Sequence, residues 1–109
     1  MNAHRFDSCI AALNACAHAC DHCAVACLQE SDPHTMARCV AIDMDCAQLC
    51  RLTASYLARS SELSAGLCRL CAEICTACAE ECSLHSMDHC RRCAQACREC
   101  CEACELEAA

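Results

Sequence analysis

The chain of 109 residues has very few of the residues that interrupt helices or fill aromatic cores. It contains one glycine, one proline, one phenylalanine, one tyrosine and no tryptophan. Beta-branched residues, which favour strands, are also scarce. Aromatic packing therefore contributes little to the core, and the composition favours long helices over a strand-rich fold.

Further absences narrow the range of functions. No long uncharged apolar run is present, so no segment is expected to span a membrane. The net charge of −7 argues against a nucleic-acid partner. The start, MNAHRFDSC, lacks the apolar region of a signal peptide, which favours a cytoplasmic location if this is the natural start. No Ser/His/Asp or paired-carboxylate constellation is visible, so we do not expect an enzyme.

Cysteine, in contrast, is abundant, with 19 in the chain. In CRLCAEICTACAEEC, residues 68–82, five cysteines are spaced three, four, three and four residues apart. At about 100° per residue they fall within an arc of roughly 80°, the width of the buried stripe of an amphipathic helix. The sulfur atoms are therefore predicted to line one face of a helix.

The same spacing recurs in three other segments, so internal repetition is the main organising signal. Thr53 and Leu57 continue the stripe of the second segment, and Cys101 lies at the edge of the arc in the fourth. The cysteines of the four segments are Cys9, Cys16, Cys20, Cys23 and Cys27; Cys39, Cys46 and Cys50; Cys68, Cys71, Cys75, Cys78 and Cys82; and Cys90, Cys93, Cys97, Cys100, Cys101 and Cys104.

Turn and cap residues separate the segments. Asp32 is a candidate N-cap with Pro33 at the first helical position, and Asp88 is favourable near a helix start. Other candidate caps are Ser60, Ser61, Ser64, Ser83 and Ser86. Helices are predicted at roughly 4–30, 33–59, 62–83 and 87–105. Short connections make neighbours antiparallel, which predicts an all-α, up-down-up-down four-helix bundle with a cysteine-lined core, as one domain over 1–109.

Three interpretations compete for the cysteines. Disulfide scaffolds are typical of secreted, loop-rich chains, and packed helix axes about 8–10 Å apart place many cross-helix pairs beyond disulfide reach. A purely structural core of cysteine packs poorly, because Cys is smaller than Leu, and presents oxidisable groups throughout. In a reducing cytosol, metal binding is the favoured interpretation.

Spacing and charge favour Cu(I) among the soft ions that thiolates select. The repeated unit is Cys-x3-Cys within a helix, as in Cys71/Cys75, and two thiolates so placed can clamp a two-coordinate cation. Several Zn(Cys)4 centres would each bury two negative charges, whereas bridged Cu(I) at about one metal per sulfur is nearly neutral, which predicts roughly 15–20 Cu(I) ions per chain. Iron–sulfur ligation is disfavoured because no cysteine precedes a proline and the cysteines diverge along a rod.

Repeated Cys-x2-Cys and Cys-x3-Cys spacing over nearly the whole chain resembles the cytosolic bacterial copper storage proteins, a cysteine-rich four-helix-bundle family. The resemblance implies storage of many Cu(I) ions by the core thiolates and assembly as a homotetramer. A copper donor or acceptor protein is a possible partner. The alternatives are a thiol redox or peroxide-scavenging protein, which would need exposed thiols of low pKa, or a general soft-metal (zinc) buffer.

The two ends of the bundle are predicted to differ. Apolar side chains gather at one end, which we call the plug: Phe6, Ile10, Leu13, Tyr56, Leu57, Leu63 and Leu67. Copper-compatible imidazoles and thioethers gather at the other, which we call the port: His34, Met36, His85, Met87 and His89. The port is expected to pass Cu(I) to the first buried thiolates.

Three other residues stand out. His18 and His22 form a His-x3-His pair off the cysteine stripe, and a solvated or inter-subunit face is favoured for them over metal binding. Asp43 lies on the stripe, which is unusual for a core position. Either Asp43 faces the mouth of the bundle or Ile42 takes its place in the core.

Overall fold

A computed structural model describes residues 4–108 and contains four long helices. The elements are α1 (Asp7–Leu28), the short 3-10 helix η1 (Pro33–Met36), α2 (Ala37–Ala58), α3 (Ser64–Cys82) and α4 (Asp88–Ala108). The predicted helices are confirmed. The largest difference is at the start of the second helix, where the first turn, over Pro33–Met36, winds as a 3-10 helix and α2 proper begins at Ala37.

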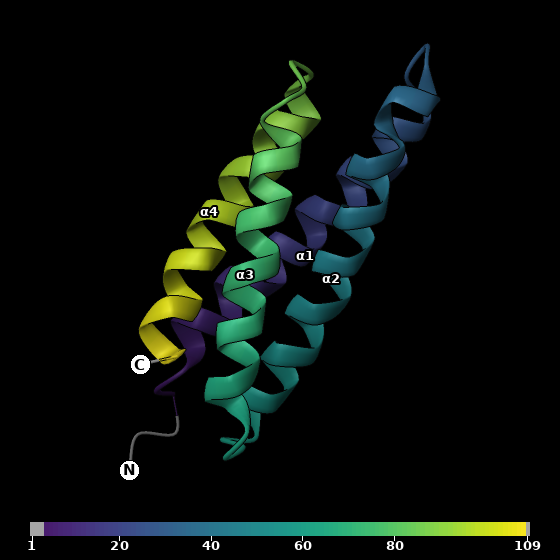
Figure 1. Ribbon diagram of the computed structural model, residues 1–109. Helices are drawn as coiled ribbons and strands as arrows, with labels where there is room; N and C mark the ends of the chain where they lie inside the picture. The colour runs from purple at the N-terminus through teal and green to yellow at the C-terminus, as the bar shows by residue number, and fades with distance from the viewer. Residues whose placement is uncertain (1–3, 109) are drawn as a thin grey trace.

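The helices run antiparallel in an elongated bundle of 51 × 18 × 17 Å (Figure 1). Each packs against two neighbours: α1 against α2 and α4, and α3 against α2 and α4. The first and last helices therefore lie side by side, with the start of α1 and the end of α4 at one end of the bundle (Figure 1). This arrangement points one face of every helix at a common axis. That one domain spans 1–109 stays a prediction.

The helix ends depend on turns more than on side-chain caps. Asp32 precedes η1 with Pro33 as its first residue, but the Asp32 side chain makes no capping hydrogen bond. Between α2 and α3, Ser60 adopts a left-handed conformation, with φ of 53°, and the Ser61 N–H donates to the Tyr56 carbonyl at 3.0 Å. A left-handed residue that redirects the chain in this way commonly ends a helix.

By length and composition alone, α1 is the one helix within residues 4–108 that could cross a membrane. The core helix of a bundle passes the same test. Here the cysteine face of α1 is buried among the other helices.

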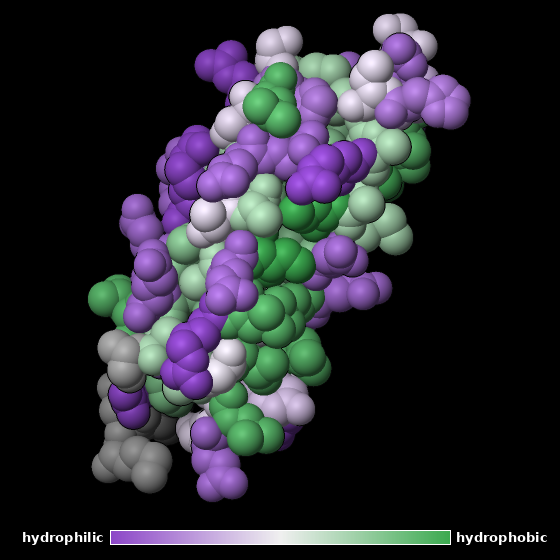
Figure 2. Space-filling model, viewed as in Figure 1, coloured by the Kyte–Doolittle hydropathy of each residue, from purple (hydrophilic) through white to green (hydrophobic). Residues whose placement is uncertain are grey.

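The core contains few large side chains. Apart from cysteine and alanine, the fully buried side chains are Leu13, Met36, Asp43, Thr53 and Leu57. Several large apolar side chains instead lie on the outside, and Figure 2 shows a band of them along the face where α2 and α3 lie. Sulfur therefore occupies positions that leucine would fill in an ordinary bundle.

Candidate metal centre

All 19 cysteines are free thiols, and 18 of them are buried. The exception is Cys101, which is partly exposed and makes contacts outside the core. Its sulfur lies 3.2 Å from the Thr76 hydroxyl and 3.5 Å from a Glu105 oxygen. The predicted stripes are thus confirmed as buried faces, with Cys101 at their edge.

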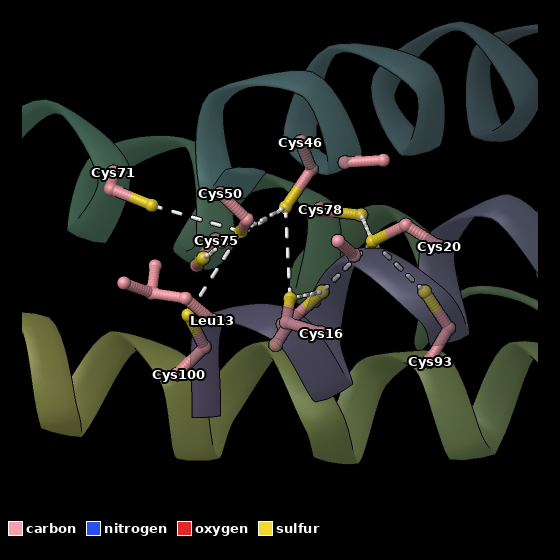
Figure 3. Close-up of a cluster of buried hydrophobic side chains, with 14 of the residues drawn as sticks. Leu13, Cys16, Cys20, Cys46, Cys50, Cys71, Cys75, Cys78, Cys93 and Cys100 are labelled. Atoms are coloured by element: carbon pink, nitrogen blue, oxygen red, sulfur yellow. Dashed lines mark hydrogen bonds between the residues drawn. The ribbon is translucent and has the colours of Figure 1, made fainter. Parts of the chain in front are cut away.

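The thiols of different helices meet at the bundle axis (Figure 3). Cys16 on α1 lies 3.9 Å from Cys46 on α2 and 3.7 Å from Cys97 on α4, measured between sulfur atoms. The corresponding distance from Cys20 on α1 to Cys78 on α3 is 3.9 Å. Disulfide bonds are about 2.0 Å long, so these are contacts between thiols and not bridges.

Sets of four thiols come close enough to share a metal ion. In each set the four sulfur atoms lie within 4.8 Å of one another. The sets overlap, because Cys16 and Cys46 belong both to the set completed by Cys50 and Cys75 and to the set completed by Cys20 and Cys97. Cys20 and Cys97 are shared in turn with the set completed by Cys78 and Cys93, and Cys50 and Cys75 with the set completed by Cys71 and Cys100. These four sets therefore form a row of shared thiols instead of separate four-ligand sites.

Burial keeps thiols near the two ends of the row protonated in the metal-free protein. It raises the pKa of Cys27 and brings the pKa of Cys90 to about 11, chiefly by disfavouring the charged thiolate. The pKa of Cys68, at the other end, is also raised to about 11, first by burial. Metal ions bind thiolates, so loading must release protons.

Asp43 is a core residue, and neither of the two placements predicted for it is correct. It is fully buried, whereas Ile42 is only partly buried. Its carboxylate accepts hydrogen bonds from the thiols of Cys78 at 3.2 Å, Cys93 at 3.3 Å and Cys82 at 3.5 Å. The helical spacing placed Asp43 on the stripe, but only the packing of three helices supplies these donors.

Burial dominates the ionisation of Asp43. The pKa of this carboxyl group is raised to about 8, first by burial and then by the nearby charge of Cys93. An aspartate with an ordinary pKa near 3.9 would be fully ionised at neutral pH. Asp43 thus places an oxygen ligand of variable charge in the middle of a sulfur row.

His89 is the port residue that reaches the thiols. Its Nδ1 atom lies 3.5 Å from the sulfur of Cys90, 3.6 Å from that of Cys23 and 3.8 Å from that of Cys27. These three cysteines belong, with Cys39, to the set of four nearest this end. An imidazole nitrogen therefore lies beside the last thiols of the row.

His85 contacts Glu81, which is paired with Arg38. Its Nε2 atom lies 3.0 Å from one oxygen of Glu81, and the other oxygen of Glu81 accepts a hydrogen bond from Arg38 at 3.0 Å. Glu81 is itself buried, with 8% of its surface exposed. Hydrogen bonds of this kind orient imidazole ligands in metal sites.

The other port residues differ from one another. Met87 is partly buried against the core, and His34, in η1, is exposed. Met36 was predicted among the residues available to incoming copper, but its side chain is fully buried. Met36 lies three residues before Cys39, so its side chain continues the buried stripe of α2.

The plug is confirmed in part. Leu13 and Leu57 are fully buried, and Phe6 and Ile10 pack against the core. Leu63 is 61% exposed, so its predicted place in the plug is wrong. It precedes α3 in the connecting turn, where its side chain faces outward. His18 and His22 are both exposed, as the favoured interpretation required.

The fold and the row of thiols together define the class of this protein. It is an all-α bundle whose core offers sulfur ligands for many soft metal ions. Comparison with known proteins identifies the family, because the copper storage protein family matches residues 2–109 and the chain belongs to it. The predicted family and fold class are confirmed.

Individual relatives are similar to this chain over most of their length. A curated protein of Bacillus subtilis (strain 168), an uncharacterized cysteine-rich protein called YhjQ, is 42% identical over 83 residues, which cover 76% of this chain and 77% of the relative. The structure of the Cu(I)-bound copper storage protein BsCsp3 is 41% identical in sequence, with a TM-score of 0.91. The match covers 95% of this chain and 98% of BsCsp3. A cytosolic copper storage protein of Streptomyces lividans, solved with five coppers, is 40% identical, with a TM-score of 0.89. The match covers 92% of this chain and 88% of the Streptomyces protein.

Proposed function

We propose that this protein stores Cu(I) in the cytoplasm, with the thiolates of its core cysteines as ligands and no catalytic role. The observation that carries the proposal is the sharing of thiols between neighbouring sets of four. A shared thiolate can bridge two ions, so a continuous row accommodates about one Cu(I) per sulfur with little net charge. Separate tetrahedral sites would need four cysteines each.

An anaerobic titration with Cu(I) tests this function. The reduced full-length protein should bind roughly 15–20 Cu(I) ions per chain, as the charge argument requires. The measurements are metal content and native mass at saturation. Saturation at four or five ions would instead indicate tetrahedral sites of the zinc type and would contradict the proposal.

The redox alternative lacks a suitable thiol among the residues that the structure describes. Catalytic or sensing thiols are exposed and have a low pKa. Cys101 is the partly exposed cysteine, and its pKa is raised, first by burial. A storage role without redox turnover is therefore the better-supported function.

We further propose that the bundle assembles as a homotetramer. Exposed large apolar side chains support this assembly, since an unpaired apolar surface favours contacts between proteins. They include Met44 and Leu52 on α2, Leu70 on α3 and Leu63 immediately before α3. Light scattering coupled to size exclusion should give four times the mass of one chain, and a monomer at micromolar concentration would exclude the assembly.

A further inference from the structure

At the plug end of the bundle, two oxygen-bearing side chains extend the line of core cysteines. Ser64 lies four residues before Cys68 on α3, and Glu107 lies three residues after Cys104 on α4. These spacings keep both residues on the cysteine faces of their helices. The end of the bundle where α1 and α3 begin and α4 ends therefore carries sulfur and oxygen ligands together (Figure 1).

Both oxygen-bearing side chains have a buried atom without a partner. The Ser64 hydroxyl oxygen and the Oε2 atom of Glu107 are each inaccessible to solvent and accept or donate no hydrogen bond. Ser64 as a whole is only 7% exposed. Buried polar atoms are almost always hydrogen-bonded, so two buried oxygens without partners at the same end of the bundle require an explanation such as a bound ion.

Three thiols surround the same place. Cys68 and Cys104 are fully buried, and Cys9 is 4% exposed. The nearby thiols of Cys104 and Cys68 act to lower the pKa of Cys9, and the negative charge of Glu107 acts to raise the pKa of both Cys9 and Cys68. The second helix provides Leu57 at this end instead of a fourth cysteine.

The two acidic side chains on the core faces, Asp43 and Glu107, differ in their hydrogen-bond partners. The Asp43 carboxylate lies within hydrogen-bonding distance of several thiols, so its polar contacts are satisfied without a metal ion. The Oε2 atom of Glu107 has no such donor. A carboxylate oxygen without a donor, at the end of the bundle that carries these three thiols, is placed to bind a cation.

We propose that Cys9, Cys68, Cys104 and Glu107 form a separate site for a borderline divalent cation, Zn(II), with the Ser64 hydroxyl alongside. Three thiolates and one carboxylate match the ligand types and number of a tetrahedral zinc site. A carboxylate oxygen is a poor ligand for Cu(I), which selects soft sulfur donors. The residual negative charge lies at the end of the bundle, near solvent, where it costs less than in the core.

The test is an anaerobic titration of metal-free protein with Zn(II) against a chromophoric chelator. The first equivalent of Zn(II) should bind tightly, and Glu107→Gln should weaken it by roughly 10- to 100-fold, the range that the loss of even an outer-shell partner of a metal site produces. Glu102→Gln is the matched control, because Glu102 is exposed on the same helix. If Glu107→Gln binds the first Zn(II) as tightly as the unaltered protein, the proposal is wrong.

A second pair of variants locates the ion. Cys9→Ser should weaken binding of the first Zn(II), whereas Cys16→Ser, which removes an interior thiol, should reduce copper capacity but keep that zinc ion. The opposite result would place the first divalent ion in the core and overturn the proposal. The Cu(I) endpoint of Glu107→Gln should be unchanged. A low copper endpoint in the unaltered protein would count against copper storage alone, because the zinc measurement involves no copper.

Discussion

Single residues set the chemistry along the axis of the bundle. Most core positions are cysteine, whose sulfur is apolar enough to be buried and is also a soft ligand. The few exceptions each change the row locally. Leu13 and Leu57 remove sulfur near one end, Asp43 adds a carboxylate in the interior, and His89 adds a nitrogen at the other end.

Replacing His85, Met87 and His89 together should slow copper uptake while leaving the final copper content nearly unchanged. A neutral ligand binds Cu(I) more weakly than a thiolate does, so it can accept an ion and pass it to Cys23, Cys27 and Cys90. Stopped-flow loading and an endpoint metal count measure the two effects. His18→Ala, on the exposed face of α1, is the control. An unchanged rate would exclude the port, and a large fall in capacity would make these residues storage ligands.

Asp43→Asn should reduce the pH dependence of stability in the metal-free protein. The pKa of Asp43 is about 8 in the fold, above its unfolded value near 3.9, so ionisation opposes folding as pH rises between these values. The thiols facing it, from all four helices, are those of Cys23, Cys39, Cys78, Cys82 and Cys93.

Urea unfolding under reducing conditions at pH 5 and pH 8 measures this effect. The unaltered protein should lose more stability between the two pH values than Asp43→Asn does. Asp45→Asn is the control because Asp45 is exposed on the same helix. Equal losses in Asp43→Asn and the unaltered protein would show that Asp43 does not carry the pH dependence.

At the scale of the helices, stability must come from few large buried side chains. A cysteine buries less apolar surface than a leucine, so each remaining leucine carries a larger share of the hydrophobic stabilisation. On α1 the fully buried leucine is Leu13, which lies between Cys9 and Cys16 on the core face. The other leucine of α1, Leu28, is 58% exposed.

Leu13→Ala should therefore destabilise the metal-free bundle by about 2–5 kcal/mol, because it leaves a cavity beside small neighbours that cannot fill it. Leu28→Ala should change the free energy of unfolding by less than about 0.5 kcal/mol. Denaturant unfolding of both variants provides the comparison. Equal effects would mean that the plug end is not packed as the structure shows.

At the scale of the whole molecule, folding and metal binding are expected to be separable. The helices are held by their turns and by contacts between neighbouring helices, and none of these requires an ion. This arrangement differs from that of zinc fingers, which are unfolded without metal.

The metal-free protein should thus be helical by circular dichroism, and loading with Cu(I) should raise its thermal midpoint, since an ion that binds only the folded state stabilises that state. The measurement is a thermal scan under anaerobic, reducing conditions before and after loading. A coil spectrum without metal would place the protein with metal-folded domains, and an unchanged midpoint would mean that copper binds outside the folded core.

The sequence by itself determined the helices and their sulfur faces. Both follow from local rules: the repeat of 3.6 residues per turn selects which cysteines share a face, and turn residues such as Asp32 and Pro33 separate the segments. The copper-compatible residues at one end and the apolar residues at the other could also be identified, because antiparallel neighbours bring helix ends together.

Only the tertiary structure decided which of those residues meet. The contact of Cys20 with Cys78, the thiol donors around Asp43 and the unpaired oxygen of Glu107 all depend on the rotation and axial offset of one helix relative to another. The exposure of Leu63 depends on the path of a short connection. Periodicity within one helix carries no information on these offsets, because packing between helices sets them.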